Sequence, residues 1–210
     1  MSLRALIADD HELFRSGLKQ LLVDVLDVEQ VLEAESFDQA IELLTVEGAG
    51  DLVLVDLRMP GMSGAETLAA LCDGFPEARV AVISAWEERA EIIAALSAGV
   101  QGYIPKSLPS NEIAAAIQHV LAGGVFVPPT LGRRDGGFRT EAGASQSGAP
   151  ERLTGRQREV LNELLKGLAS KEIARTLDIA EGTVKIHLAA IYRALGVRTR
   201  AEAIAKLKSR

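Results

Sequence analysis

Short apolar runs alternate with helical patterns through the first 125 residues of this 210-residue chain, and this alternation constrains the fold more than any other feature. Between the runs, apolar residues recur at the spacing of a helix that buries one face. Strands that are apolar almost without interruption are typical of a parallel sheet covered on both faces. The runs are Leu3–Ala8, Val28–Glu33, Leu52–Asp56, Val80–Ser84 and Gly102–Ile104. We therefore expect an α/β domain with a five-stranded, doubly wound parallel sheet of the flavodoxin-like kind.

From Leu153 onward the pattern is helical only. It predicts helices over residues 157–166, 171–177, 182–195 and 200–208. In the third of these, Val184, Leu188 and Ile191 recur on one face, which predicts that they are core residues. A turn of four residues, 178–181, separates the second and third helices. The sequence thus predicts a second, all-α domain of four helices that contains a helix-turn-helix.

The segment between the two patterns is rich in Gly, Pro, Ser and Ala and has no apolar period. This composition predicts a flexible linker. We expect an α/β domain over residues 1–125, a linker over 126–150 and a helical domain over 151–210. Three spacings also fit a capping box at a helix start: Ser36 with Gln39, Ser63 with Glu66, and Thr154 with Gln157.

Charge divides the chain in the same way. Residues 1–125 hold 7 Lys and Arg against 20 Asp and Glu, a net charge of −13, whereas residues 151–210 hold 13 against 7, a net charge of +6. This asymmetry indicates two domains with different partners. For the basic end, charge alone leaves binding to a polyanion and a merely solvated surface as equal alternatives.

The compartment follows from what the sequence lacks. No run of about 18 apolar residues is present, so we expect no membrane segment. Charge arrives at Asp9 and Asp10, too early for a signal peptide. The single cysteine, Cys72, rules out an intrachain disulfide and fits a reducing compartment. We therefore expect a cytoplasmic protein.

Polar residues follow four of the five predicted strands. Asp9 and Asp10 end the first, Asp56 the third and Ser84 the fourth, and Lys106 follows the fifth. Carboxyl ends of parallel strands meet at one edge of a sheet, so these side chains should gather there. Grouped carboxylates repel one another unless a cation intervenes, and their hard oxygen atoms suit Mg²⁺. Mg²⁺ would also neutralise a phosphoryl group passed to Asp56, with Ser84 and Lys106 holding its oxygen atoms. The plainer alternative is a set of unrelated surface residues.

The residues at these strand ends resemble those of a known family. Residues 3–122 are similar to the receiver domain of two-component response regulators. The resemblance rests on residues 7–11 (IADDH), 55–64 (VDLRMPGMSG), 83–85 (ISA) and 102–106 (GYIPK). It implies that Asp56 accepts a phosphoryl group from a histidine kinase. It also implies that Mg²⁺ is held by Asp9, Asp10, Asp56 and the backbone carbonyl of Arg58. It further implies that Ser84 moves toward the phosphoryl group and that Tyr103 changes rotamer, which reshapes a dimerisation face.

Two features depart from the usual family pattern. Lys106 is followed by Ser107, where proline after a cis bond is common, so the isomer of this bond stays open. Arg58 and Trp86 are bulky and stand two positions after Asp56 and Ser84. They predict a phosphoaspartate that is screened from water and long-lived.

The helical domain carries a second resemblance. Residues 153–207 are similar to DNA-binding domains of the LuxR/NarL type, over the motifs 153–154 (LT), 158–161 (REVL), 171–174 (KEIA), 183–185 (TVK) and 195–197 (LGV). The whole chain thus resembles a NarL/FixJ-type response regulator. The resemblance implies a homodimeric transcriptional regulator that binds promoter DNA and has a cognate histidine kinase.

The third helix of this domain is expected to enter the major groove. Lys185 is the candidate for a guanine or phosphate contact, and Ile186 for a thymine methyl group. His187 is expected to pack or to bind phosphate rather than to read a base. The remaining candidates suit phosphate contacts that position the protein: Lys171, Thr183, Arg193, Arg198 and Arg200.

Two other functions remain as alternatives. Hydrolases of the haloacid-dehalogenase type also use an aspartate at a strand end with Mg²⁺. They need a second aspartate two residues later, where this chain has Arg58, so we do not expect an enzyme. A regulator that works without phosphorylation is the second alternative. The switch itself has two possible forms: the first domain masks the helix from Gly182, or phosphorylation dimerises that domain.

Overall fold

The computed structural model describes residues 3–48, 50–132, 153–197 and 199–208. The first domain is built on one parallel sheet with the strand order β2-β1-β3-β4-β5, as the apolar runs predict. The strands are β1 (Leu3–Ala8), β2 (Val28–Ala34), β3 (Leu52–Val55), β4 (Arg79–Ser84) and β5 (Gly102–Pro105). Every strand pair runs parallel. The carboxyl ends of β1, β3, β4 and β5 therefore meet at one edge of the sheet.

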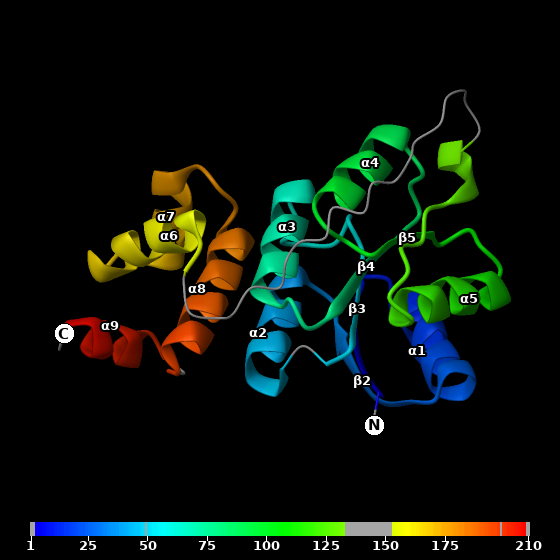
Figure 1. The fold of residues 1–210 in the computed structure, drawn as a ribbon, viewed down its shortest axis with the longest axis horizontal. Helices are drawn as coiled ribbons and strands as arrows, with labels where there is room; N and C mark the ends of the chain where they lie inside the picture. The colour runs from blue at the N-terminus through cyan, green and yellow to red at the C-terminus, as the bar shows by residue number, and fades with distance from the viewer. Residues whose placement is uncertain (1–2, 49, 133–152, 198, 209–210) are drawn as a thin grey trace.

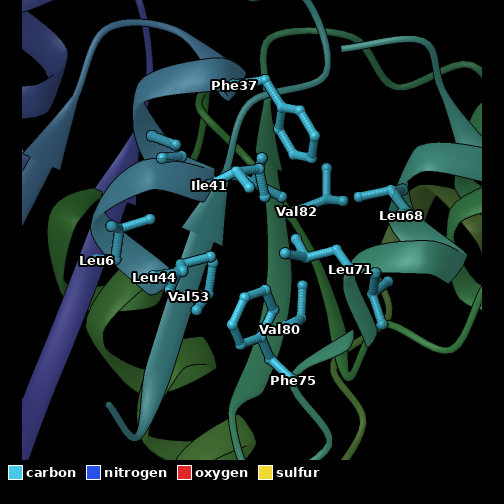
Figure 2. Packing of buried hydrophobic residues seen from close by; sticks show 14 of the residues in the cluster. Leu6, Phe37, Ile41, Leu44, Val53, Leu68, Leu71, Phe75, Val80 and Val82 are labelled. Carbon is cyan, nitrogen blue, oxygen red and sulfur yellow. The ribbon is translucent and has the colours of Figure 1, made fainter. Parts of the chain in front are cut away.

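Five helices cover the two faces of this sheet (Figure 1). They are α1 (Glu12–Leu26), α2 (Phe37–Glu47), α3 (Ala65–Gly74), α4 (Arg89–Ser97) and α5 (Ser110–Leu121). Helices α2, α3 and α4 pack on one face, where Figure 2 shows Phe37 near Val82 and Phe75 near Val53 and Val80. Helices α1 and α5 pack on the other face, over Leu52 and Leu54. Neighbouring β3 residues thus enter opposite cores, which is why its sequence is apolar throughout.

The second domain is all-α, as predicted. Its helices are α6 (Gly155–Leu165), α7 (Ser170–Leu177), α8 (Glu181–Leu195) and α9 (Arg200–Lys208). Val184, Leu188 and Ile191 of α8 lie in the core that these helices share, which confirms the predicted core face. Thr154 and Gln157 form the predicted capping box at the start of α6. No helix in the described ranges is long and apolar enough to cross a membrane.

Two local predictions need correction. The Ser63–Glu66 capping box is absent, because α3 starts from Gly64, whose φ of 90° is a conformation that favours glycine. The second correction concerns the predicted flexible linker, whose first residues have regular structure. Phe126 pairs with the outer edge of β5, and a 3-10 helix, η1 (Pro129–Gly132), follows and packs near α4 through Leu131. The remaining predicted linker residues, 133–150, lie outside the described residues.

Candidate functional site

Two aspartates are buried at the carboxyl edge of the sheet. Asp9 follows β1 and is 0% exposed, and Asp56 follows β3 and is 2% exposed. Their positions are fixed by the backbone, because the Asp9 N–H donates to the Ala34 carbonyl at 3.0 Å and the Asp56 N–H donates to the Ala8 carbonyl at 2.8 Å. Parallel pairing of neighbouring strands thus brings together two carboxylates that are 47 positions apart in the sequence.

Lys106 neutralises part of this charge. Its Nζ lies 2.6 Å from Asp9 Oδ2 and 3.0 Å from Asp56 Oδ2. The ammonium group also lies 4.8 Å from the centre of the Phe14 ring, a favourable cation–π distance. The backbone N–H of Lys106 donates to the Ser84 carbonyl, and this hydrogen bond holds the residue after β5 at the site. The Lys106–Ser107 peptide bond is trans.

The remaining geometry fits a divalent cation. One ligand atom from each of Asp9, Asp10, His11 and Asp56 lies within 4.8 Å of the others, close to the widest ligand separation around one small ion. Asp56 Oδ1 is buried and has no hydrogen-bond partner, which is costly unless a ligand satisfies it. The predicted cluster therefore comes together in space, with one member that we did not predict, His11. Arg58 lies in the loop after Asp56, so its carbonyl remains a predicted ligand.

Ser84 and Tyr103 are joined through one backbone segment. Both side chains are buried. The Trp86 N–H donates to Ser84 Oγ at 3.2 Å, and the Tyr103 hydroxyl donates to the Trp86 carbonyl at 2.7 Å. Burial raises the pKa of Tyr103 above its ordinary value, so the hydroxyl stays protonated as a donor. A displacement of Ser84 would therefore shift the hydrogen-bond partner of Tyr103 through the backbone of residues 84–86.

Arg58 and Trp86, the two bulky residues after Asp56 and Ser84, contact each other. The Arg58 guanidinium lies 5.2 Å from the centre of the Trp86 ring and forms an ion pair with Glu91 of α4. These two contacts join the loop after β3, which contains Arg58, to the segment after β4 and to the start of α4. The sequence predicts a screening role for both bulky residues, and their stacking fits that role.

Helix α8 of the second domain packs against α2 and α3 of the first (Figure 1). Thr183 and Ile186 are 1% and 0% exposed. Thr183 Oγ1 lies 3.3 Å from Thr67 Oγ1 of α3, and Ile186 belongs to the same apolar cluster as Leu71 and Phe75. The face of α8 that we predict to meet DNA is therefore covered by the first domain.

Glycines allow this close approach. A Cβ added to Gly74, at the end of α3, would lie 2.7 Å from Ile186 Cγ2. A Cβ added to Gly182 would lie 3.1 Å from the carbonyl oxygen of Gly61 and from the Phe37 ring. Gly61 belongs to the loop that starts at Asp56, so this loop connects the acidic site with α8.

Ion pairs between the acidic and basic domains surround the apolar contact. Lys185 Nζ lies 3.0 Å from Asp38 Oδ1 of α2, and Arg156 of α6 lies 3.7 Å from Glu66 of α3. Lys185 is our main candidate for a base contact. In the docked arrangement its ammonium group is paired with the Asp38 carboxylate, in the place of a DNA partner. Partly exposed pairs of this kind add little stability but favour one docking orientation.

The other predicted DNA contacts lie in different surroundings. His187 is buried, and that burial together with nearby Arg156 lowers the pKa of His187 below its ordinary value. Lys171 is exposed on α7. Arg200 donates to the carbonyls of Leu168 and Leu164, at 2.8 and 3.4 Å, so it supports the fold of the helical domain. The side chains of Arg193 and Arg198 lie outside the described residues.

Comparison with known proteins assigns both domains. Residues 5–118 match the model of the response regulator receiver domain, and residues 151–207 match bacterial regulatory proteins of the luxR family. The chain is 38% identical to the glycerol metabolism activator of Pseudomonas putida, over 96% of this chain and 93% of that protein. It is 34% identical to the nitrate/nitrite response regulator NarL of Escherichia coli K12, over 94% and 91%. Among solved structures, the response regulator ChrA of a heme-sensing two-component system aligns over 99% of this chain and 97% of its own, with 30% identity and a TM-score of 0.51.

Proposed function

Because this chain belongs to the NarL/FixJ-type response regulators, a family of DNA-binding transcriptional regulators rather than enzymes, we propose that phosphorylation of Asp56 controls its access to DNA. The observation that carries the proposal is the burial of α8 against the receiver domain, beside the loop that starts at Asp56. In this closed arrangement the receiver masks the helix that would enter the major groove. The proposal favours masking over a switch that acts through receiver dimerisation alone.

The acidic site supports phosphoryl transfer from a histidine kinase. Asp56 Oδ1 is free of hydrogen bonds and can attack phosphorus, so that a P–O bond forms while the P–N bond to the kinase histidine breaks. Asp9, Asp10, Asp56 and the carbonyl of Arg58 would hold Mg²⁺, which supplies positive charge to the transferred group when bound. Lys106 and the Ser84 hydroxyl would then bind phosphoryl oxygen atoms, and Lys106 would give up its contact with Asp56.

Movement at Asp56 has two short routes outward. One runs through the loop to Gly61, which touches Gly182 of α8. The other runs through Ser84 and the Trp86 backbone to Tyr103. The first route would loosen the contact with α8, and the second would change the receiver surface that a second copy could use. Phosphorylation then biases a two-state equilibrium between a closed form and an open form that dimerises on DNA.

In the open form α8 presents its N-terminal residues to the major groove. Lys185 leaves Asp38 and reaches a guanine or a phosphate, and Ile186 leaves the receiver core and meets a thymine methyl group. Lys171, Thr183, His187, Arg193 and Arg198 contribute phosphate contacts, with Arg200 as a weaker candidate because it already binds two carbonyls.

The test of this function uses the full-length chain and a pool of DNA fragments. Protein activated with beryllofluoride and Mg²⁺ is used to select DNA, and fluorescence anisotropy then compares the selected site with scrambled DNA. We expect tighter, sequence-dependent binding after activation. Equal affinity with and without activation would instead support the regulator that works without phosphorylation.

We predict that Arg58→Ala or Trp86→Ala shortens the life of the phosphoaspartate. Each change removes one of the two contacting side chains that we propose to screen Asp56 from water. A rate increase of about tenfold corresponds to about 1.4 kcal/mol of the hydrolysis barrier. Loss of labelled phosphate after removal of the donor measures the rate. Glu88→Ala, an exposed residue near the same loop, is the control. Unchanged lifetimes of seconds in all variants would contradict a screening role.

We also predict that acid opens the unphosphorylated protein. Burial lowers the pKa of His187 in the closed form, so the closed form is favoured while His187 is neutral. The release of α8 lets His187 bind a proton, so this contribution is fully present above about pH 6.5 and is lost as the pH falls toward the lowered value. The radius of gyration from small-angle scattering should rise between about pH 7.5 and 5.5. His187→Gln should remove this dependence and His119→Gln should keep it, whereas the same dependence in His187→Gln would assign the effect to other groups.

A further inference from the structure

We propose that Phe14 is a positioning residue for phosphoryl transfer, because its ring holds the ammonium group of Lys106 beside Asp56. The inference rests on the proposed function and adds an aromatic residue that acts on the phosphoryl group through Lys106. Phe14 lies in the first turn of α1. The residues that the family resemblance implies for phosphoryl transfer do not include it.

The position of the ring is the main evidence. Lys106 Nζ lies 4.8 Å from the centre of the Phe14 ring, inside the distance of about 6 Å at which an aromatic face attracts a cation. The same ammonium group lies 2.6 Å from Asp9 Oδ2 and 3.0 Å from Asp56 Oδ2. The Lys106 side chain is only 11% exposed, and a cation–π contact is stronger when the cation is shielded from water.

The apolar core holds the ring in place. Phe14 is partly buried and packs against the cluster that α1 and α5 form over the sheet, which includes Leu18 and Ile104. The backbone of Lys106 is fixed as well, because its N–H donates to the Ser84 carbonyl at 2.8 Å. The lysine side chain is therefore held at both ends, which reduces the rotamer freedom that it would lose on binding a phosphoryl oxygen.

The ring matters most during the transfer itself, because the two carboxylate partners of Lys106 then change their roles. In the proposed reaction Asp9 would hold Mg²⁺ and Asp56 would carry the phosphoryl group, so both carboxylates gain partners that compete with Lys106. The Phe14 ring takes no part in either change, so its attraction for the ammonium group persists. Phe14 thus keeps Lys106 beside Asp56 while Lys106 stabilises the charge of the transferred group.

A graded series at Phe14 separates this role from packing. Fluorine atoms on the ring withdraw electrons from its face and weaken a cation–π contact, whereas the shape of the ring changes little. The full-length protein is made with one, two or three fluorine atoms on the Phe14 ring, and intact mass follows its phosphorylation by acetyl phosphate with Mg²⁺. We expect the rate to fall with each added fluorine atom. Phe14→Leu, which is apolar but has no ring, should lower the rate by about 2- to 30-fold, the range that corresponds to the strength of cation–π contacts.

The matched control is the same fluorinated series at Phe126, which packs against the same apolar cluster from its place beside Gly102 and should show no stepwise decrease. Thermal unfolding verifies that each variant is folded. Equal rates across the fluorinated Phe14 series would overturn the proposal whatever the rate of Phe14→Leu, because packing alone does not depend on the electrons of the ring. A decrease of the same size in the Phe126 series would overturn it too. A wild-type protein that forms no adduct would overturn the proposed function instead.

Discussion

Replacing Gly74 with leucine is expected to raise the affinity of the unphosphorylated protein for its DNA by about 5- to 150-fold. A Cβ at this position would lie 2.7 Å from Ile186 Cγ2, so a larger side chain cannot fit while α8 is docked. Overpacking of this kind costs about 1–3 kcal/mol, and each 1.4 kcal/mol is a factor of about ten in an equilibrium. The change lies in the receiver, so it leaves the predicted DNA surface intact.

A matched substitution makes this result interpretable. Gly17→Leu places the same side chain on α1, on the opposite face of the sheet, where an added Cβ meets nothing within 4 Å. Gly74→Ala should have a smaller effect in the same direction, because the alanine side chain is smaller than that of leucine. Alanine also favours the helical conformation of α3. Thermal unfolding verifies that all three variants are folded. If folded Gly74→Leu binds DNA no more tightly than Gly17→Leu, the docked α8 does not limit DNA binding.

Asp56→Asn is expected to abolish the phosphoryl adduct and the activation that depends on it. Asparagine keeps the size of the side chain but lacks the carboxylate that attacks phosphorus. It also removes one charge from the buried cluster and leaves Lys106 paired with Asp9 alone. Intact mass after incubation with acetyl phosphate and Mg²⁺ measures the adduct, and anisotropy measures DNA binding in the same samples.

Asp24→Asn is the matched control for this change, since Asp24 is an exposed aspartate on α1. It should accept phosphate at Asp56 as readily as the wild-type protein does. Two outcomes would count against the proposed phosphoacceptor. One is an adduct that persists in Asp56→Asn, and the other is an increase in DNA affinity that does not need the adduct.

The sequence predicted the sheet and most of the acidic site because both follow from local rules. Apolar runs mark strands that are buried on both faces, and strand ends in a parallel sheet converge on one edge. Asp9, Asp56 and Lys106 meet for this reason. His11 was missed because it follows the strand end on the way into α1, where its direction depends on the backbone turn rather than on the strand pattern.

The docking of α8 could not be predicted in the same way. Periodicity showed that one face of α8 is a core face and that the other face is free for a partner. It did not show that this partner is α2 and α3 of the same chain. Gly74 and Gly182 are the residues that permit the contact. In the sequence, however, a helical glycine does not indicate whether another helix packs against it. Interdomain contacts depend on shape across long sequence separations, which single-sequence patterns do not contain.

The most direct test of the account measures the distance between the two domains. Spin labels at Glu42→Cys on α2 and Arg175→Cys on α7, both exposed positions, in a Cys72→Ser background report it by pulsed electron resonance. We predict one short distance in the unphosphorylated protein and a longer, broader distribution after activation with beryllofluoride and Mg²⁺, but no change when Asp56→Asn is added. A distribution that stays short while the activated protein gains DNA affinity would contradict the claim that phosphorylation at Asp56 releases α8.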